Sequence, residues 1–164
     1  MATVEQTTSS AQLQGLLRGD YLDPSAPGYD DARAVYNAMI DKHPAAIVRC
    51  ADVADVIASL AHAREHELRV AVRGGGHNGG GLGSVDDGLV IDLSPMHGVI
   101  VDPSDKLVRV QGGATLAAVD HATHAIGLAV PGGIISPTGI GGLTLGGYLG
   151  HITRRCGRTL DNLV

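Results

Sequence analysis

Glycine occupies eight of the fifteen positions from 74 to 88, between two apolar segments, 68–72 and 89–92, that we predict to be strands. Glycine loses more backbone entropy on folding than any other residue, so this density needs a physical reason. The usual reason is that backbone N–H groups must closely approach a ligand, most commonly a phosphate or pyrophosphate. The sequence therefore predicts a diphosphate-binding loop, with His77 in its middle flanked by Arg73 and Asn78.

A dinucleotide-binding Rossmann unit is one interpretation of this loop. Gly74, Gly76 and Gly79 match the GxGxxG pattern, and Asp92 lies about where a ribose-binding acid is expected. The Rossmann fold also requires a helix directly after these glycines. Residues 79–88 contain five glycines, and each costs about 1 kcal/mol relative to alanine in a helix. A nicotinamide-dependent Rossmann oxidoreductase is therefore the weaker interpretation.

The flanking segments predict a mixed α+β fold. Residues 44–50 form a predicted strand, followed by a helix over 53–67 with Asp52 as its N-cap. The spacing of Val53, Val56, Ile57 and Leu60 predicts the buried face of that helix. Strand, helix and strand in this order indicate a parallel βαβ unit. Segments 99–102 and 107–110 predict a hairpin, and Thr115 caps a further predicted helix with Leu116, Val119 and Ile126 on one side.

A second glycine block covers residues 131–150, and Leu145, Leu149 and Ile152 follow a helical spacing. We therefore predict that the block continues as a helix whose glycines permit close approach. Close approach has two explanations, contact with a ligand or tight helix–sheet packing without one.

Metal and disulfide chemistry are not predicted. His62, Glu65 and His66 match the HxxEH pattern of a class of zinc peptidases. The apolar spacing, however, places both histidines opposite the predicted buried face, where no metal pocket would form. Cys50 and Cys156 have no metal-ligand spacing, and we expect two free thiols.

Charge and hydropathy narrow the expected partners and location. The net charge is -5 without a basic cluster, which argues against nucleic acid and anionic membranes as partners. No apolar run approaches the eighteen or so residues of a membrane span, and the first residues lack the basic and apolar regions of a signal peptide. We therefore expect a cytoplasmic protein.

Three segments resemble one flavoprotein family: VAVRGGGHNGGG followed by VIDLSPM, TGIGGLTLGGYLG, and RRCGRTLDNLV. They are similar to the berberine-bridge-enzyme-like branch of the vanillyl-alcohol oxidase superfamily. Tyr29, Asp30, Arg33 and Asn37 are similar to the opening segment of that branch. Tyr148, His151 and Cys156 depart from it, since relatives commonly have glycine, tryptophan and an aromatic residue there.

The resemblance implies a PCMH-type FAD-binding fold with a small parallel βαβ region and antiparallel strands, incomplete at its C-terminal end. Residues 1–40 would be an N-terminal arm with a short helix, and residues 41–164 would be the N-terminal portion of the FAD domain. Some relatives attach FAD twice, but residues 133–137 lack the second, cysteine, attachment point. Covalent attachment is therefore expected through His77 alone, at the flavin 8-methyl group.

The implied cofactor-binding residues are those that match the family motifs one by one: His77, Arg73, Gly74, Gly75, Gly76, Asn78, Gly79, Leu93, Ser94, Pro131, Gly132, Thr138, Gly139, Gly141, Gly142, Gly146, Gly147 and Val164. No catalytic residue and no metal ligand is expected in this chain.

The function implied by the resemblance is that of the FAD-binding portion of an oxidoreductase. The whole enzyme would oxidise a small organic substrate, such as an alcohol, a sugar or an alkaloid-like or polyketide-like compound, by hydride transfer to FAD, with reoxidation by dioxygen. A C-terminal remainder or a complementing chain would supply the substrate domain, and this chain alone is expected to be inactive. A noncatalytic remnant or assembly module with the same fold is the other alternative.

Overall fold

The computed structural model describes residues 10–164, so the first nine residues of the predicted N-terminal arm lie outside the described part. The chain divides into two compact units. The first unit contains residues up to Arg73 together with Asn78–Pro95, and the second contains Gly74–His77 and Met96–Val164. The glycine loop is thus shared, because its first four residues group with the second unit.

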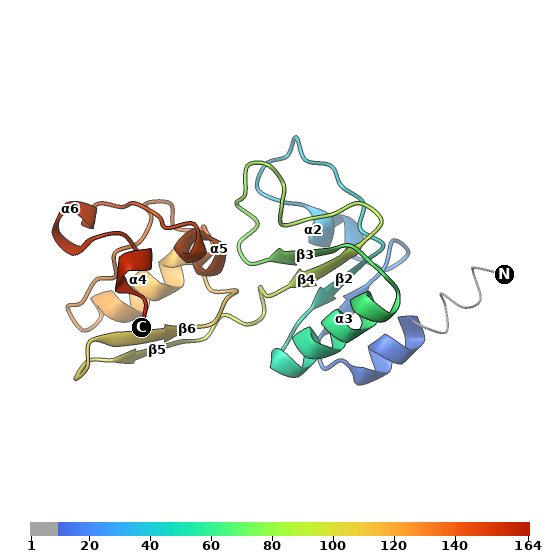
Figure 1. The fold of residues 1–164 in the computed structure, drawn as a ribbon, viewed down its shortest axis with the longest axis horizontal. Coiled ribbons are helices and arrows are strands. Elements are labelled where there is room, and N and C mark those ends of the chain that lie inside the picture. Colours follow the sequence, from blue (N-terminus) through green and yellow to red (C-terminus); the bar gives the residue numbers. More distant parts are fainter. Residues whose placement is uncertain (1–9) are drawn as a thin grey trace. The chain divides into compact units, whose positions relative to one another are not determined.

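The first unit is built on a four-stranded sheet, and three of its strands, β2, β3 and β4, are labelled in Figure 1. Its strands are β1 (Asp20–Leu22), β2 (Ala46–Arg49), β3 (Val70–Arg73) and β4 (Leu89–Asp92), in the order β1-β2-β4-β3. Strands β2, β4 and β3 are parallel, and β1 is antiparallel to β2. The predicted strands are confirmed, but β4 lies between β2 and β3. The glycine loop is therefore the crossover between the parallel strands β3 and β4, a connection that proteins usually make with a helix.

One face of this sheet packs against the short helix α2 (Tyr29–Arg33). Ile47, Ala71 and Val90 are paired across the three parallel strands and form a buried cluster with Tyr29. The Tyr29 hydroxyl donates a 2.6 Å hydrogen bond to the Pro44 carbonyl oxygen. Because side chains alternate along a strand, Arg49, Asp92 and Arg73 at the strand ends share this face.

Helix α3 (Val53–Glu65) lies beside the sheet in Figure 1, and its predicted N-cap is confirmed. Asp52 accepts hydrogen bonds from the backbone N–H groups of Ala54 and Asp55. The predicted buried face is wrong, since Val53 and Ile57 are 62% and 63% exposed. The helix instead buries Asp55, Ser59 and Ala63, which also follow a helical spacing. Periodicity misidentified the face because it weights apolar side chains, whereas a buried carboxylate determines how this helix docks.

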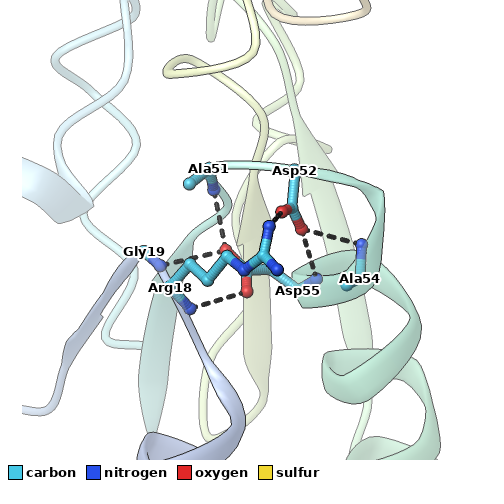
Figure 2. Close-up of polar contacts among 6 residues, drawn as sticks. All are labelled: Arg18, Gly19, Ala51, Asp52, Ala54 and Asp55. Carbon is cyan, nitrogen blue, oxygen red and sulfur yellow. Dashed lines mark hydrogen bonds and ion pairs between the residues drawn. The ribbon is translucent and has the colours of Figure 1, made fainter.

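Asp55 ties the N-terminal segment to the sheet, as Figure 2 shows. Its buried carboxylate accepts the backbone N–H groups of Arg18 at 2.9 Å, Gly19 at 3.0 Å and Ala51 at 2.8 Å. Burial by itself would raise the pKa of Asp55, but these hydrogen bonds favour the carboxylate and leave the pKa below its usual value. Asp55 therefore joins three chain segments. They are the Arg18–Gly19 segment that follows the helical residues 10–16, Ala51 after β2, and helix α3 itself.

The second unit combines a hairpin with short helices. Strands β5 (Val99–Asp102) and β6 (Leu107–Val110) form the predicted antiparallel hairpin. They are followed by α4 (Leu116–His124), α5 (Ile140–Leu145), α6 (Thr153–Cys156) and the 3-10 helix η1 (Leu160–Asn162). The core is formed by Leu116 and Val119 of α4, Ile140 and Leu143 of α5, and Ala114. The mixed α+β prediction is confirmed.

Two predictions about the helices of the second unit are wrong. The glycine block does not continue as a helix, because α5 ends at Leu145 with Gly146 as its C-cap, and Gly147 adopts a positive φ of 76°. Leu145 and Leu149 are accordingly 78% and 62% exposed. Ile126 lies beyond the end of α4, and Thr123 takes the buried position.

Other features of residues 10–164 bear on partners. No helix in this range combines the length and apolarity needed to cross a membrane. No group of three or more His, Cys, Asp or Glu side chains in the same range could hold a metal ion. Both cysteines are free thiols, Cys50 buried and Cys156 exposed.

Candidate functional site

The parallel strands of the first unit end in a charged cluster. The Arg73 guanidinium donates from Nη2 to Asp92 Oδ2 at 2.9 Å, and both side chains are buried. Arg49 Nε lies 3.9 Å from the same carboxylate oxygen, and Asp92 Oδ1 accepts the Ser94 amide at 3.0 Å. The carboxylate predicted to bind ribose in a Rossmann unit is therefore committed to Arg73. Residues 74–88 also contain no helix, so neither requirement of the Rossmann interpretation is met.

Arg73 retains a buried hydrogen-bond donor. Its Nη1 atom is inaccessible to solvent and has no acceptor among the described residues. A buried donor without a partner costs about 1–3 kcal/mol, and more when the group is charged. The Arg73 guanidinium at the end of β3, where the glycine loop begins, therefore has one N–H group without a hydrogen-bond acceptor among the described residues.

The second half of the glycine loop, Asn78–Gly88, belongs to the first unit. Asn78 organises a tight turn, since its carbonyl accepts the Gly81 amide at 3.0 Å and its Oδ1 accepts the Leu82 amide at 3.1 Å. Gly81 has a φ of 73°, and a Cβ there would lie 2.6 Å from Ile40 Cγ2. Gly79, by contrast, is exposed, and a Cβ there would meet no atom within 4 Å. The turn thus leaves open backbone around Gly79.

The first half of the loop packs in the second unit against two other glycine segments. A Cβ at Gly75 would lie 2.8 Å from Gly139 Cα and overlap the Gly139 nitrogen. A Cβ at Gly74 or at Gly141 would lie 2.9 Å from the Gly112 carbonyl oxygen. At these positions glycine is needed for backbone-to-backbone packing. The ligand explanation of the glycines therefore does not extend to every position in the two blocks.

Replacing Gly75 with alanine is expected to destabilise the protein by about 2–3 kcal/mol, because the new methyl group meets backbone that cannot rotate aside. Gly142 is the matched control, since it lies within α5 and a Cβ there would meet nothing within 4 Å. Gly142→Ala should leave stability unchanged or raise it, because alanine favours helices. Denaturant unfolding of both variants measures the difference, and equal stabilities would contradict the packing role of Gly75.

The loop before α5 is held by backbone hydrogen bonds within the second unit. The Thr138 carbonyl accepts the Leu116 amide at 2.9 Å, and the Ile140 amide donates to the Ala114 carbonyl at 2.8 Å. Thr115 and Gly139 form an isolated antiparallel bridge. Gly139 is thus brought against Gly75, and Gly141 lies near Gly74 through the Gly112 carbonyl, while Gly142 faces open space. Gly146 is the C-cap of α5, and Gly147 follows it.

The turn at Pro131 and Gly132 is enclosed by the chain's last segments. Thr159 Oγ1 donates to the Pro131 carbonyl at 2.6 Å, and a Cβ at Gly150 would overlap the Gly132 carbonyl oxygen. A Cβ at Gly133 would lie 2.7 Å from a ring carbon of Tyr148. The tyrosine that departs from the family pattern is therefore accommodated because residue 133 is glycine.

The remaining predicted residues divide between the two units. Leu93 and Ser94 are half-buried in the first unit, and the Leu93 amide donates to the Arg73 carbonyl at 2.8 Å. His77 is half-buried in the second unit, and Val164 is fully exposed. Gly112 was not predicted as part of the site, although the Gly112-Gly113 pair directly before a helix cap was a visible signal.

Comparison with known proteins identifies the family. Residues 44–164 match the profile of a family described as FAD binding domain. The chain belongs to this FAD-binding family. An FAD-linked oxidoreductase of Bacillus subtilis (strain 168) is 37% identical over 148 residues, which cover 90% of this chain and 33% of that protein. The (R)-6-hydroxynicotine oxidase of Paenarthrobacter nicotinovorans is 30% identical over 148 residues, covering 90% of this chain and 32% of the oxidase.

Solved structures agree with this assignment. The 6-hydroxy-D-nicotine oxidase of Arthrobacter nicotinovorans has a TM-score of 0.88 at 30% identity, covering 90% of this chain and 33% of that one. A berberine-bridge-enzyme-like protein of Physcomitrella patens has a TM-score of 0.87 at 28% identity, covering 94% of this chain and 34% of that one. The predicted berberine-bridge-like resemblance and PCMH-type fold are confirmed. The chain spans about a third of the length of the relatives it matches.

Proposed function

We propose that this chain is the FAD-binding portion of an FAD-dependent oxidoreductase and that His77 carries FAD covalently. FAD binding follows from the family, and the glycine loop is its natural site. The attachment through His77 is supported by the position of this residue in the RGGGHN motif, which the chain shares with relatives that bind FAD through histidine. Besides His77, we propose that the cofactor-binding residues are the motif residues named in the sequence analysis.

The observation that carries the proposal is the open backbone at Asn78–Gly80. All three residues are exposed, and among the described residues of the first unit no backbone carbonyl accepts a hydrogen bond from their amide N–H groups. Backbone N–H groups at a turn are the preferred partners of phosphate oxygens. These exposed amides fit a diphosphate, whereas the glycines at 75 and 139 serve packing.

When bound, FAD supplies the redox chemistry by accepting a hydride from a substrate C–H bond and passing electrons to dioxygen. The chain's own residues would bind and orient it. An imidazole nitrogen of His77 would form a bond to the 8-methyl carbon of the flavin. That step removes one hydrogen from His77 and one from the methyl group, and dioxygen takes up both with two electrons as hydrogen peroxide.

The substrate and the rest of the catalytic machinery belong to the proposal as well. The substrate would be a small organic molecule, such as an alcohol, a sugar or an alkaloid-like or polyketide-like compound. A further part of the protein, or a complementing chain, would cover the flavin and provide the base that takes the substrate proton. We propose a cytoplasmic location, with no nucleic acid or membrane as a partner, in keeping with the net charge of -5.

Titration of the flavin-free protein with FAD and with NADH tests this proposal. Binding should quench flavin fluorescence with FAD and produce no saturable signal with NADH. The opposite pattern would favour the Rossmann interpretation. A folded protein that binds neither ligand would favour a noncatalytic assembly module.

A further inference from the structure

Two side chains hold the second half of the glycine loop, Asn78–Gly88, by its carbonyl groups. Lys42 Nζ donates to the Gly81 carbonyl oxygen at 2.8 Å and to the Ser84 carbonyl oxygen at 2.9 Å. Asn37 Nδ2 donates to the Gly79 carbonyl oxygen at 2.9 Å. These donors lie 39 to 42 residues earlier in the chain than their acceptors, in the segment between α2 and β2. Three loop carbonyls are therefore fixed from one side.

The segment that carries these donors is itself braced. Arg33 at the end of α2 pairs with Asp30 at 2.7 Å and with Asp41, and it donates to the Lys42 carbonyl at 3.3 Å. Asn37 Oδ1 accepts the Met39 amide at 3.1 Å, which orients the side-chain amide. Lys42 is half-buried, so its ammonium group is held near the loop.

Fixing a carbonyl also fixes the next amide. In a trans peptide the C=O of one residue and the N–H of the next point in opposite directions, and residues 10–164 contain no cis peptide bond. The hydrogen bond from Asn37 to the Gly79 carbonyl therefore turns the Gly80 N–H away from Asn37. Gly80 is exposed, and its N–H donates to no backbone carbonyl in the described part of the first unit.

We propose that Lys42 and Asn37 are positioning residues for FAD binding. Asn37 orients the Gly80 amide toward the diphosphate, and Lys42 holds the Gly81–Ser84 turn on which the Asn78–Gly80 backbone rests. The inference rests on the proposed function. A loop with this many glycines would otherwise lose much conformational entropy on binding. Preorganisation by Lys42 and Asn37 removes part of that cost in advance, which raises affinity without contact between either side chain and the cofactor.

The test compares Lys42→Met with Lys106→Met in the full chain. The sequence contains only these two lysines, so the variants make the same charge change, and Lys106 lies exposed in the turn between β5 and β6. Both are made in the His77→Ala background, so that reversible FAD binding can be measured by flavin fluorescence. Lys42→Met should raise the Kd for FAD about tenfold, and Lys106→Met should leave it unchanged.

Stability loss is separated from loss of positioning by a third variant. Tyr29→Phe removes the buried hydrogen bond to the Pro44 carbonyl in the same unit, so it should lower stability but leave the Kd for FAD unchanged. Hydrogen exchange of the flavin-free protein should become faster at the Gly81, Leu82 and Ser84 amides in Lys42→Met only.

Lys42→Arg should restore part of the affinity, because a guanidinium can also donate to two carbonyls. If Lys42→Met does not fold, Asn37→Ala replaces it, with an expected rise in Kd of about fivefold.

The outcomes distinguish the two proposals. A His77→Ala protein that binds FAD equally well with or without Lys42 and Asn37 would overturn the positioning role and leave the proposed function intact. A folded protein that binds no FAD even with both residues present would overturn the proposed function, and the positioning role with it.

Discussion

Replacing His77 with alanine is expected to abolish covalent flavin while leaving the chain folded. The imidazole is the proposed nucleophile toward the flavin, and an alanine methyl group cannot form that bond. His77 is half-buried in a loop and lies outside the buried core clusters of both units, so its loss should cost little stability. Intact mass under denaturing conditions should fall to that of the bare polypeptide, and thermal unfolding should change by only a few degrees.

His124 provides the matched control for this variant, because it is an exposed histidine at the end of α4. His124→Ala should retain the full mass of the flavin-loaded protein. Covalent flavin that persists in His77→Ala would show that another residue is the attachment point, and it would overturn the role proposed for His77.

Replacing Asp55 with alanine is expected to destabilise the first unit by about 3–4 kcal/mol. The change leaves the backbone N–H groups of Arg18, Gly19 and Ala51 without their charged acceptor, and each hydrogen bond to a charged group contributes about 1.5–3 kcal/mol. The total is smaller than three full contributions because Arg18 and Ala51 are exposed and water can replace the carboxylate as acceptor. Denaturant unfolding of the full chain measures the loss, and hydrogen exchange at Arg18 and Gly19 should become faster.

Asp52→Ala is the control for the Asp55 variant. Both aspartates accept backbone N–H groups at the start of α3, but Asp52 is partly exposed. Its loss should cost about 1 kcal/mol, the usual penalty for removing an N-cap. Equal losses in the two variants would contradict the special role of the buried carboxylate.

The Asp55 contribution should also depend on pH in a defined direction. Because the folded-state pKa of Asp55 is lowered, the stabilisation is fully present above the unfolded-state pKa of about 3.9. It is lost as pH falls through the lower folded-state pKa. The stability difference between the native protein and Asp55→Ala should therefore be constant from about pH 5 to 7 and decrease below about pH 4. A difference that grows on acidification would contradict the lowered pKa.

The sequence correctly predicts the elements that are determined by residues close together in the chain. The hairpin 99–110 follows from strand-forming segments around a turn, and the Asp52 cap follows from one side chain and the amides beside it. The family motifs correctly predict an FAD-binding fold, because each motif combines several residues at fixed spacing.

Features specified by distant parts of the chain were not predictable in this way. The position of β4 between β2 and β3 depends on which strands pair with each other. The residues within a single strand do not determine its neighbours in the sheet. The buried face of α3 depends on Asp55 meeting Arg18 and Gly19. Gly75 is required by Gly139, 64 positions later in the sequence. A glycine needed for packing and a glycine needed for a ligand look the same in a sequence.

The most direct test of FAD binding with covalent attachment is the intact mass of the purified full-length protein under denaturing conditions, together with its visible spectrum. We predict a mass increased by one FAD less two hydrogen atoms, and a flavin absorbance band that stays with the polypeptide after unfolding. A mass equal to the bare polypeptide, with a colourless protein that does not respond to added FAD, would contradict the proposed function.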